Sequence, residues 1–327
     1  MCTAITYKTK DFYFGRTLDL EYHYNESVTV TPRRYPLSFR HGGEMSEHYA
    51  IIGIATVADG YPLYYDAVNE KGLCIAGLAF WQSAKYHAIR PNSDNIASFE
   101  LVPWLLGQCA SVAEARARLG KINITDTAFS DAFPPSPIHW MIADGEEAIT
   151  VEPSAEGLRV YDNPIGVLTN EPSFEYHMTN LNNYINLSPC DPICRFAQGA
   201  DLRIYSRGMG AMGLPGDLSS ASRFVRAAFT KLNSVSGEDE DDSVCQFFHV
   251  LGTVSQTRGS VRLLEMGGEK HERTVYTSCC NAEKGIYYYT TYENSRIASV
   301  EMYREDIESE KLISYPLKYE SDIDILN

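Results

Sequence analysis

The chain has 327 residues, of which 44% are hydrophobic and 12% aromatic, enough for a sizeable core. Its formal net charge of −15 argues against a nucleic-acid partner, because such binding depends on clustered lysine and arginine. No run approaches the ~20 apolar residues of a membrane span, and no charged region followed by an apolar run marks a signal peptide. We therefore expect a cytoplasmic protein that keeps its cysteines as thiols.

The first predicted strand begins at Cys2. Removal of Met1 would leave Cys2 with a thiol and a free α-amine on one residue. The reference pKa of an α-amine is about 7.7–8.0, so a neutral amine is available near pH 7 as a general base for the thiol. The alternative is that Met1-Cys2 reflects only the start codon, and that Cys2 is a small hydrophobic residue.

The N-terminal third is typical of β-structure. Residues 2–7 and 12–16 flank a short turn and predict a hairpin. Further strands are expected at 49–57, 61–68 and 73–80, where β-branched and aromatic residues alternate with Gly-rich turns. Helical spacing follows within 99–120, and Ser111 opens a predicted capping box.

The rest of the chain returns to strands, then helices, then strands again. The strands are expected at 138–143, 148–151, 158–161, 166–169, 274–280, 285–291 and 297–303, and the helices at 174–185, 219–232 and 243–254. The acidic run at 238–242 is interpreted as a solvated loop between two helices. The order of elements predicts an α+β fold of two antiparallel sheets with helices outside, in one domain of residues 1–327.

Two motifs suggest chemistry that their surroundings do not support. Residues 208–213 match G-x-G-x-x-G, but Pro215 follows where a dinucleotide-binding helix would begin, so we predict a Gly-rich loop. Cys190 and Cys194 have the spacing of half a zinc site without a second ligand pair, and the histidines are scattered. We expect no metal site.

Four polar residues could serve Cys2. Arg16 would lie near the chain start in the predicted hairpin and favour a thiolate, and Asp19 could hold the α-ammonium. Asn170 follows a strand and could donate to an oxyanion, and Arg223 lies in the first turns of a Ser-capped helix. Each has a plainer reading: a surface ion pair for Arg16 and Asp19, a turn former for Asn170, and a solvated helix residue for Arg223.

Several longer segments of the sequence, some of which contain these residues, are also distinctive. They are MCTA at the start, GRTLDLEY at 15–22, NEKGL at 69–73, IHWMIAD at 138–144, GVLTNEPSF at 166–174, GLPGDLSSASRF at 213–224 and EKGIYYYTTYEN at 283–294. Together they resemble the choloylglycine hydrolase family, which holds bile salt hydrolases and penicillin V acylases. These are N-terminal nucleophile hydrolases with a cysteine nucleophile, and the resemblance covers nearly the whole chain.

The resemblance implies a four-layer αββα fold, hydrolysis of a linear amide, no cofactor and a homotetramer. It implies that Cys2 is both nucleophile and base, and that Arg16 and Asp19 tune and orient it. It assigns Asn170 to the oxyanion hole and Arg223 to charge stabilisation.

The resemblance also points to the substrate pocket. A second oxyanion donor would be the backbone N–H of Ala79, where the bile salt branch has Asn and penicillin V acylases usually have Tyr. The substrate-facing positions fall on a mainly apolar set, namely Leu18, Tyr24, Ala58, Phe129 and Phe133. Such a set suits a steroid body.

We therefore expect an amidase that acts on a small-molecule amide, preferably a glycine- or taurine-conjugated bile salt. Because the net charge repels an anionic substrate, we expect Arg16 and Arg223 to capture its anion. Two alternatives stay open. One is an acylase for penicillin V or N-acyl homoserine lactones, and the other is a catalytically silent binding protein on the same fold.

Overall fold

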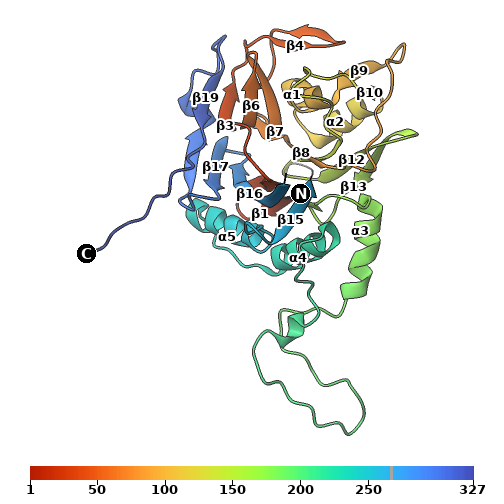
Figure 1. Cartoon of the computed structure of the whole chain (residues 1–327), viewed down its shortest axis with the longest axis vertical. Helices are drawn as coiled ribbons and strands as arrows, with labels where there is room; N and C mark the ends of the chain where they lie inside the picture. The colour runs from red at the N-terminus through yellow and green to blue at the C-terminus, as the bar shows by residue number, and fades with distance from the viewer. Residues whose placement is uncertain (266–267) are drawn as a thin grey trace.

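Two antiparallel sheets form the centre of the computed structural model, which describes residues 1–265 and 268–327 (Figure 1). The first sheet has the order β14-β1-β2-β16-β17-β18, with β15 paired to β16. Its strands are β1 (Cys2–Lys8), β2 (Phe12–Leu20), β14 (Val167–Leu168), β15 (Val261–Glu265), β16 (Gly268–Asn281), β17 (Ile286–Thr291) and β18 (Ala298–Glu301). The start of the chain therefore lies in the interior of this sheet, between β14 and β2.

The second sheet has the order β13-β12-β11-β8-β7-β6-β3-β19. Its strands are β3 (Ser27–Thr31), β6 (Ile51–Ala58), β7 (Tyr61–Asn69), β8 (Cys74–Ala79), β11 (Ile138–Ala143), β12 (Ala148–Ser154), β13 (Gly157–Asp162) and β19 (Ile313–Pro316). Two small pairs stand apart from both sheets: β4 (Leu37–Phe39) with β5 (Gly43–Met45), and β9 (Asp94–Ala97) with β10 (Ile122–Thr125). Strand β8 contacts β1 and β2, so the two sheets pack face to face.

Helices cover the outer face of each sheet. Helices α1 (Leu101–Gln108) and α2 (Val112–Leu119) share a buried hydrophobic cluster with the second sheet. On the other side, α4 (Ser220–Asn233) and α5 (Glu240–Gly252) pack against the first sheet, and α3 (Phe174–Asn180) lies beside α4 (Figure 1). The expected αββα layering is confirmed.

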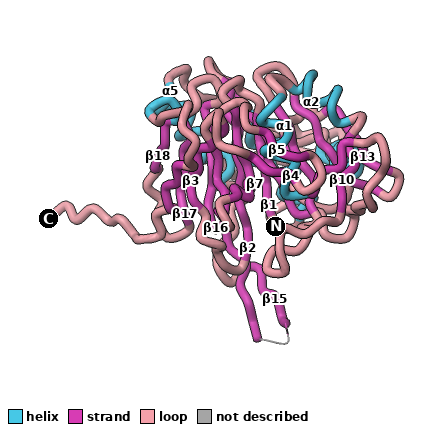
Figure 2. Tube along the Cα trace, turned by 90° about the horizontal axis from the view of Figure 1, so that it is seen from above, coloured by secondary structure: helices cyan, strands magenta, loops and turns pink. Residues whose placement is uncertain are grey.

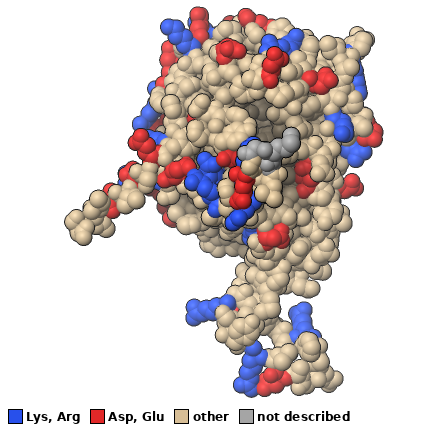
Figure 3. Space-filling model, in the orientation of Figure 1, with Lys and Arg blue, Asp and Glu red and all other residues tan. Residues whose placement is uncertain are grey.

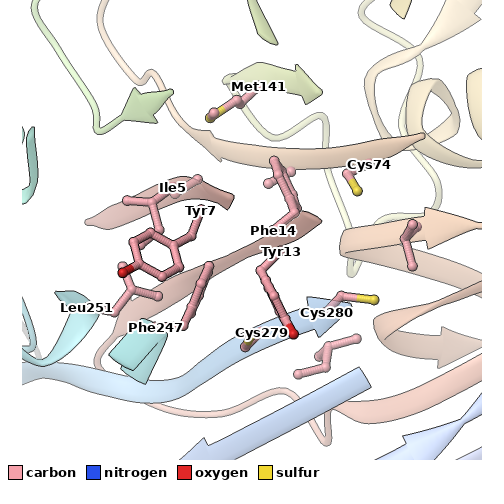
Figure 4. Close-up of a cluster of buried hydrophobic side chains, with 14 of the residues drawn as sticks. Ile5, Tyr7, Tyr13, Phe14, Cys74, Met141, Phe247, Leu251, Cys279 and Cys280 are labelled. Atoms are coloured by element: carbon pink, nitrogen blue, oxygen red, sulfur yellow. The ribbon is translucent and has the colours of Figure 1, made fainter. Parts of the chain in front are cut away.

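The main core fills both faces of the first sheet. Figure 4 shows Tyr7 beside Phe247 and Leu251 of α5, while Phe14 points toward the second sheet, where Met141 lies. These side chains come from alternating strand positions, which place successive residues on opposite faces. With both faces covered, every residue of β1 and β2 except the last of each strand is buried, polar residues included.

Most predicted elements are present, with two kinds of difference. The acidic run at 238–242 is not a loop: Asp239 caps α5 by accepting from the Asp242 backbone N–H at 2.8 Å, and residues 240–242 form the first turn. Acidic side chains at a helix N-terminus interact favourably with the helix dipole, which is why this run is helical. The strands that were not predicted are β3, β4, β5, β9, β10, β15 and β19. Of these, β3 and β19 pair with each other at the edge of the second sheet.

Two segments extend from the body. Residues 185–219 form a long excursion between α3 and α4, with only the short turn Met209–Ala211 near its end, so the G-x-G-x-x-G run lies in a loop as predicted (Figure 1). Strands β15 and β16 form a hairpin that projects from the layers (Figure 2). Within residues 1–265 and 268–327, no helix combines the length and apolar character needed to cross a membrane.

Candidate active site

The sequence-predicted polar residues converge on the start of β1. In the first sheet, Cys2 lies opposite Leu18 of β2, and on its other side β1 pairs with β14, which ends two residues before Asn170. Ala79 ends β8 of the facing sheet, and Arg223 reaches β1 from α4 in the outer layer. The site is therefore assembled from both sheets and a helix.

Cys2 is buried with 3% of its surface exposed, and Met1 is present before it. The backbone N–H of Cys2 donates to Asn170 Oδ1 at 2.9 Å, and its carbonyl accepts from Arg223 Nη1 at 2.5 Å. The Met1 ammonium group donates to the Asp19 carbonyl oxygen at 2.7 Å and to Glu272 Oε1 at 2.5 Å. The atom that would become the catalytic α-amine is thus already held in place by Asn170.

Asn170 has a side-chain amide in a fixed orientation. Its Oδ1 accepts from the Cys2 N–H and from Arg223 Nη2 at 2.6 Å, and its Nδ2 donates to the Ala79 carbonyl at 2.8 Å. The second hydrogen on Nδ2 is the one that can donate to an oxyanion. The reading of Asn170 as a mere turn former does not account for these three contacts.

Arg223 is fully buried in the first turns of α4. The start of this helix is fixed by Ser219, whose side chain accepts from the Ser222 N–H, and by Asp217, which accepts from the Ser222 hydroxyl at 2.6 Å. Hydrogen bonds from the serines hold the pKa of Asp217 at about 2. This capped start directs Arg223 toward β1, so Arg223 is not a solvated helix residue.

Arg16 and Asp19 are both fully buried, which excludes the surface ion pair. Arg16 donates to backbone carbonyls of Gly77, Tyr65 and Thr17. Burial alone would lower the pKa of Arg16, but the acidic groups near it, led by Cys2, raise it. The Asp19 carboxylate accepts from hydroxyl groups of Thr274 at 2.7 Å and Thr17 at 3.2 Å. With Met1 in place, it is the Asp19 backbone carbonyl that contacts the terminal ammonium group.

The expectation that Arg16 and Arg223 capture the anion of a substrate is wrong. Both guanidinium groups have no exposed surface, and the donors that form hydrogen bonds point to carbonyl, hydroxyl and amide oxygens of the chain. Arg16 Nη2 is buried without a hydrogen-bond partner, but because neither residue has exposed surface, an incoming anion cannot reach either guanidinium group.

The predicted substrate positions lie around the ends of β6 and β7. Ala58 pairs with Tyr61 across the β6–β7 hairpin, and the Tyr61 ring lies 5.8 Å from that of Phe129, centroid to centroid. Phe133 packs 6.1 Å from Phe129, and Arg40 lies over the Phe129 ring. The backbone carbonyl of Tyr24 accepts from the Thr56 hydroxyl of β6, and Tyr24 is 38% exposed. Leu18, buried opposite Cys2, completes the set.

Three contributors were missed from the sequence. His177 donates from Nε2 to the Asn170 carbonyl at 2.8 Å, and Ser220 accepts from the Asn170 N–H at 2.8 Å, so together they hold its backbone. Burial lowers the pKa of His177 to about 4. The third is Glu272, which pairs with the terminal ammonium group. Their positions follow from long-range packing, and only the Ser219-Ser220 cap carried a local signal.

The described residues contain no cluster of three or more His, Cys, Asp and Glu side chains that could hold a metal ion. Cys190 and Cys194 are exposed in the long excursion, whereas Cys279 and Cys280 are buried in β16 with their sulfur atoms on different sides of the strand (Figure 4).

Comparisons with known proteins agree with this geometry. A model of the linear amide C–N hydrolases, choloylglycine hydrolase family, matches residues 2–315. A bile salt hydrolase/transferase from Lactiplantibacillus plantarum is 54% identical over 327 residues, covering 100% of both chains. A protein of the same description from Clostridium perfringens is 38% identical, and the match covers 99% of each chain.

Solved structures show the same fold. The crystal structure of a mutant conjugated bile acid hydrolase from Clostridium perfringens has a TM-score of 0.91 at 38% identity and covers 100% of both chains. A penicillin V acylase from Agrobacterium tumefaciens, with a TM-score of 0.75 at 19% identity, covers 96% of this chain and 90% of its own, and shares the fold alone. The chain therefore belongs to the choloylglycine hydrolase family and is a linear amide C–N hydrolase of the N-terminal nucleophile type.

Proposed function

We propose that the enzyme hydrolyses the amide bond of glycine- and taurine-conjugated bile salts. The observation that carries the proposal is the full-length identity of 54% to a bile salt hydrolase/transferase, combined with Cys2 placed against Asn170 and Arg223. The apolar positions near Phe129 and Leu18 support a steroid acyl group.

The proposed mechanism begins after Met1 has been removed. The α-amine of Cys2 takes the thiol proton, and Sγ attacks the amide carbonyl. The oxyanion of the tetrahedral intermediate accepts from Asn170 Nδ2 and from the Ala79 backbone N–H. The α-ammonium returns the proton to the leaving nitrogen as the C–N bond breaks. Water, deprotonated by the same amine, then attacks the thioester and releases the bile acid.

Three buried residues support this cycle without contacting the substrate, namely Arg16, Asp19 and Arg223. Arg223 fixes the Cys2 carbonyl and Asn170 together, and its positive charge favours the thiolate. Arg16 adds a second buried positive charge near the thiol. Asp19 fixes the end of β2 beside the chain start through hydrogen bonds from Thr17 and Thr274.

We further propose a cytoplasmic homotetramer in which residues 1–327 act as one domain. The family resemblance supports the tetramer, and so does the long excursion, which carries exposed apolar side chains such as Phe196 (82%) and Tyr205 (82%). Strands from both halves of the chain share the first sheet, which supports a single domain. Analytical ultracentrifugation of the purified enzyme would test the assembly.

The test of the substrate compares kcat/KM for glycocholate, taurocholate, penicillin V and an N-acyl homoserine lactone in one buffer. Intact mass should first show a chain that lacks one methionine. We expect the bile salts to be preferred, with glycine release detected by ninhydrin. A tenfold advantage for penicillin V would assign the enzyme to the acylases, and no turnover of any amide would favour the silent binding protein.

The identity of the nucleophile is tested by Cys2→Ser. Serine is far less acidic than cysteine, so the same amine generates little nucleophile, and we expect most glycocholate turnover to be lost while the fold is kept. Cys245→Ser, at an exposed cysteine of α5, is the matched control and should keep full activity. Turnover of Cys2→Ser near that of the control would rule out Cys2. Full activity in a preparation that retains Met1 would equally contradict the role of the α-amine.

A further inference from the structure

A buried carboxylate from a distant strand holds the chain terminus. Glu272 of β16 has 5% of its surface exposed, and its Oε1 lies 2.5 Å from the Met1 nitrogen. Strand β2 separates β16 from β1 in the sheet, so this side chain reaches across β2 to the start of β1. A buried carboxylate is stable only when it is paired with a cation or well hydrogen-bonded.

Glu272 also acts electrostatically on the residues around Cys2. Burial raises the pKa of Glu272, and the terminal ammonium group opposes that rise. The negative charge of Glu272 is in turn one of the influences that counter the lowering of the Arg223 pKa by burial. The charged groups that face Glu272 or Cys2 are Asp19 and Arg16 of β2, Glu21 after it, and Arg223 of α4.

Removal of Met1 takes away the cation that pairs with Glu272. The new terminal nitrogen, that of Cys2, is three covalent bonds from the old one and hence at most about 4 Å away. It becomes a titratable amine in place of an amide. Asp19 and Glu21 are acidic and cannot serve as counter-ions to Glu272.

We propose that Glu272 is a positioning residue for the reaction: in the mature enzyme its carboxylate takes the α-ammonium group of Cys2 as its counter-ion and sets the pH range in which Cys2 is active. This proposal rests on the proposed function of the α-amine as base. A nearby negative charge favours the protonated form of both the amine and the thiol. The active state carries one proton on this pair, so Glu272 moves both limits of the activity profile to higher pH.

The experiment measures the pH dependence of glycocholate kcat/KM in mature wild type and in Glu272→Gln. The isosteric amide removes the charge, so the acidic limb should move to lower pH by about half to one unit. Glu293→Gln is the matched control, because Glu293 pairs with Arg258 and Arg273, and among the described residues its ion pairs do not include the terminal ammonium group. Its profile should stay at the wild-type position.

A second readout does not need turnover. The rate of Cys2 alkylation by iodoacetamide, followed on the N-terminal peptide by mass spectrometry, should show the same shift to lower pH in Glu272→Gln. This separates the proposal from the substrate assignment, since alkylation reports Cys2 even if bile salts are not hydrolysed.

Glu272→Asp keeps the negative charge, so the midpoints of its kcat/KM and alkylation pH profiles should stay close to those of wild type. A folded Glu272→Gln enzyme with an unchanged or upward-shifted midpoint in both readouts would overturn the proposal. So would a shift in Glu272→Asp as large as that in Glu272→Gln, because shape rather than charge would then be responsible.

Discussion

Asn170 is the residue whose geometry predicts the clearest kinetic effect. Its Nδ2 is aimed by the bond to the Ala79 carbonyl, and its Oδ1 is held by Arg223. Asn170→Ala removes one oxyanion donor, and we expect kcat to fall by roughly 10²–10³ with a smaller change in KM. Steady-state kinetics with glycocholate would measure this. Asn183→Ala, at an exposed asparagine, is the control, and a loss of less than fivefold in Asn170→Ala would contradict the assigned donor.

His177 links the same site to pH-dependent stability. Burial lowers its pKa to about 4, against about 6.5 in an unfolded chain, so the unfolded state binds more protons between these values. The stability contributed by neutral His177 should therefore be complete above pH 6.5 and decline as the pH falls toward 4, by up to about 3 kcal/mol.

Urea unfolding of wild type and His177→Asn at pH 7.5, 6 and 5 would measure this contribution. We expect the wild-type advantage in unfolding free energy to shrink steadily as the pH falls. His249→Asn, at an exposed histidine of α5, should differ from wild type by the same amount at each pH. A wild-type advantage over His177→Asn that grows on acidification would contradict the lowered pKa of His177.

The residues of the site were predictable to different degrees. Cys2 stood out on chemical grounds, whereas the roles of Arg16, Asp19, Asn170 and Arg223 required the family resemblance. Glu272 and His177 were missed for a physical reason: Glu272 meets Met1 across 271 positions of sequence, and no local periodicity encodes such a contact. The prediction that arginines capture the substrate anion was wrong because the sequence shows the charge of Arg16 and Arg223 but not their burial.

Strand β16 is the element that organises the first sheet. It pairs with β2, β15 and β17, and it brings Glu272 to the Met1 ammonium group and Thr274 to Asp19 of β2. The pairing with β2 depends on a close approach at Gly15, where an added Cβ would lie 2.1 Å from the Ser278 carbonyl oxygen. Because that neighbour is backbone within a paired strand, it cannot move without disturbing the sheet.

Gly15→Ala should therefore destabilise the protein by about 2 kcal/mol or more, as overpacking in a close-packed core does. Gly252→Ala in α5, where an added Cβ meets no atom within 4 Å, is the control and should be neutral or slightly stabilising. The free energy of unfolding from urea titration measures both. Equal stability of the two variants would show that β2 and β16 can move apart at Gly15 with little cost in free energy.

Some helices and strands could be predicted from local sequence signals alone. The hairpin of β1 and β2 and the helices α2 and α4 were expected from alternation, spacing and Ser caps, and they are present. Helix α5 was placed three residues late because acidic residues were read as a solvated loop, although an Asp cap followed by acids is a helix start. Strands β3 and β19 are short, and their pairing joins positions near the two ends of the chain.

At the scale of the whole molecule, charge is the property that reaches the substrate first. The net charge of −15 repels an anionic bile salt on average. Near the centre of the face in Figure 3, basic and acidic side chains lie side by side. Pairs on or next to the β15–β16 hairpin include Arg262 with Glu269 at 3.4 Å and Arg258 with Glu293 at 3.2 Å. Such pairs cancel locally and provide little long-range attraction.

Added salt should therefore leave kcat/KM for glycocholate flat or raise it slightly, by no more than about twofold between low and physiological ionic strength. The Debye length falls from about 30 Å to about 8 Å over this range, which screens the general repulsion and leaves buried contacts of Arg16 and Arg223 unchanged. The uncharged methyl ester of glycocholate is the control substrate and should show no dependence. The measurement is kcat/KM for both compounds at several NaCl concentrations. A steep fall for glycocholate alone would show that an unpaired basic surface steers the substrate, and would contradict the local cancellation of charge between the surface pairs.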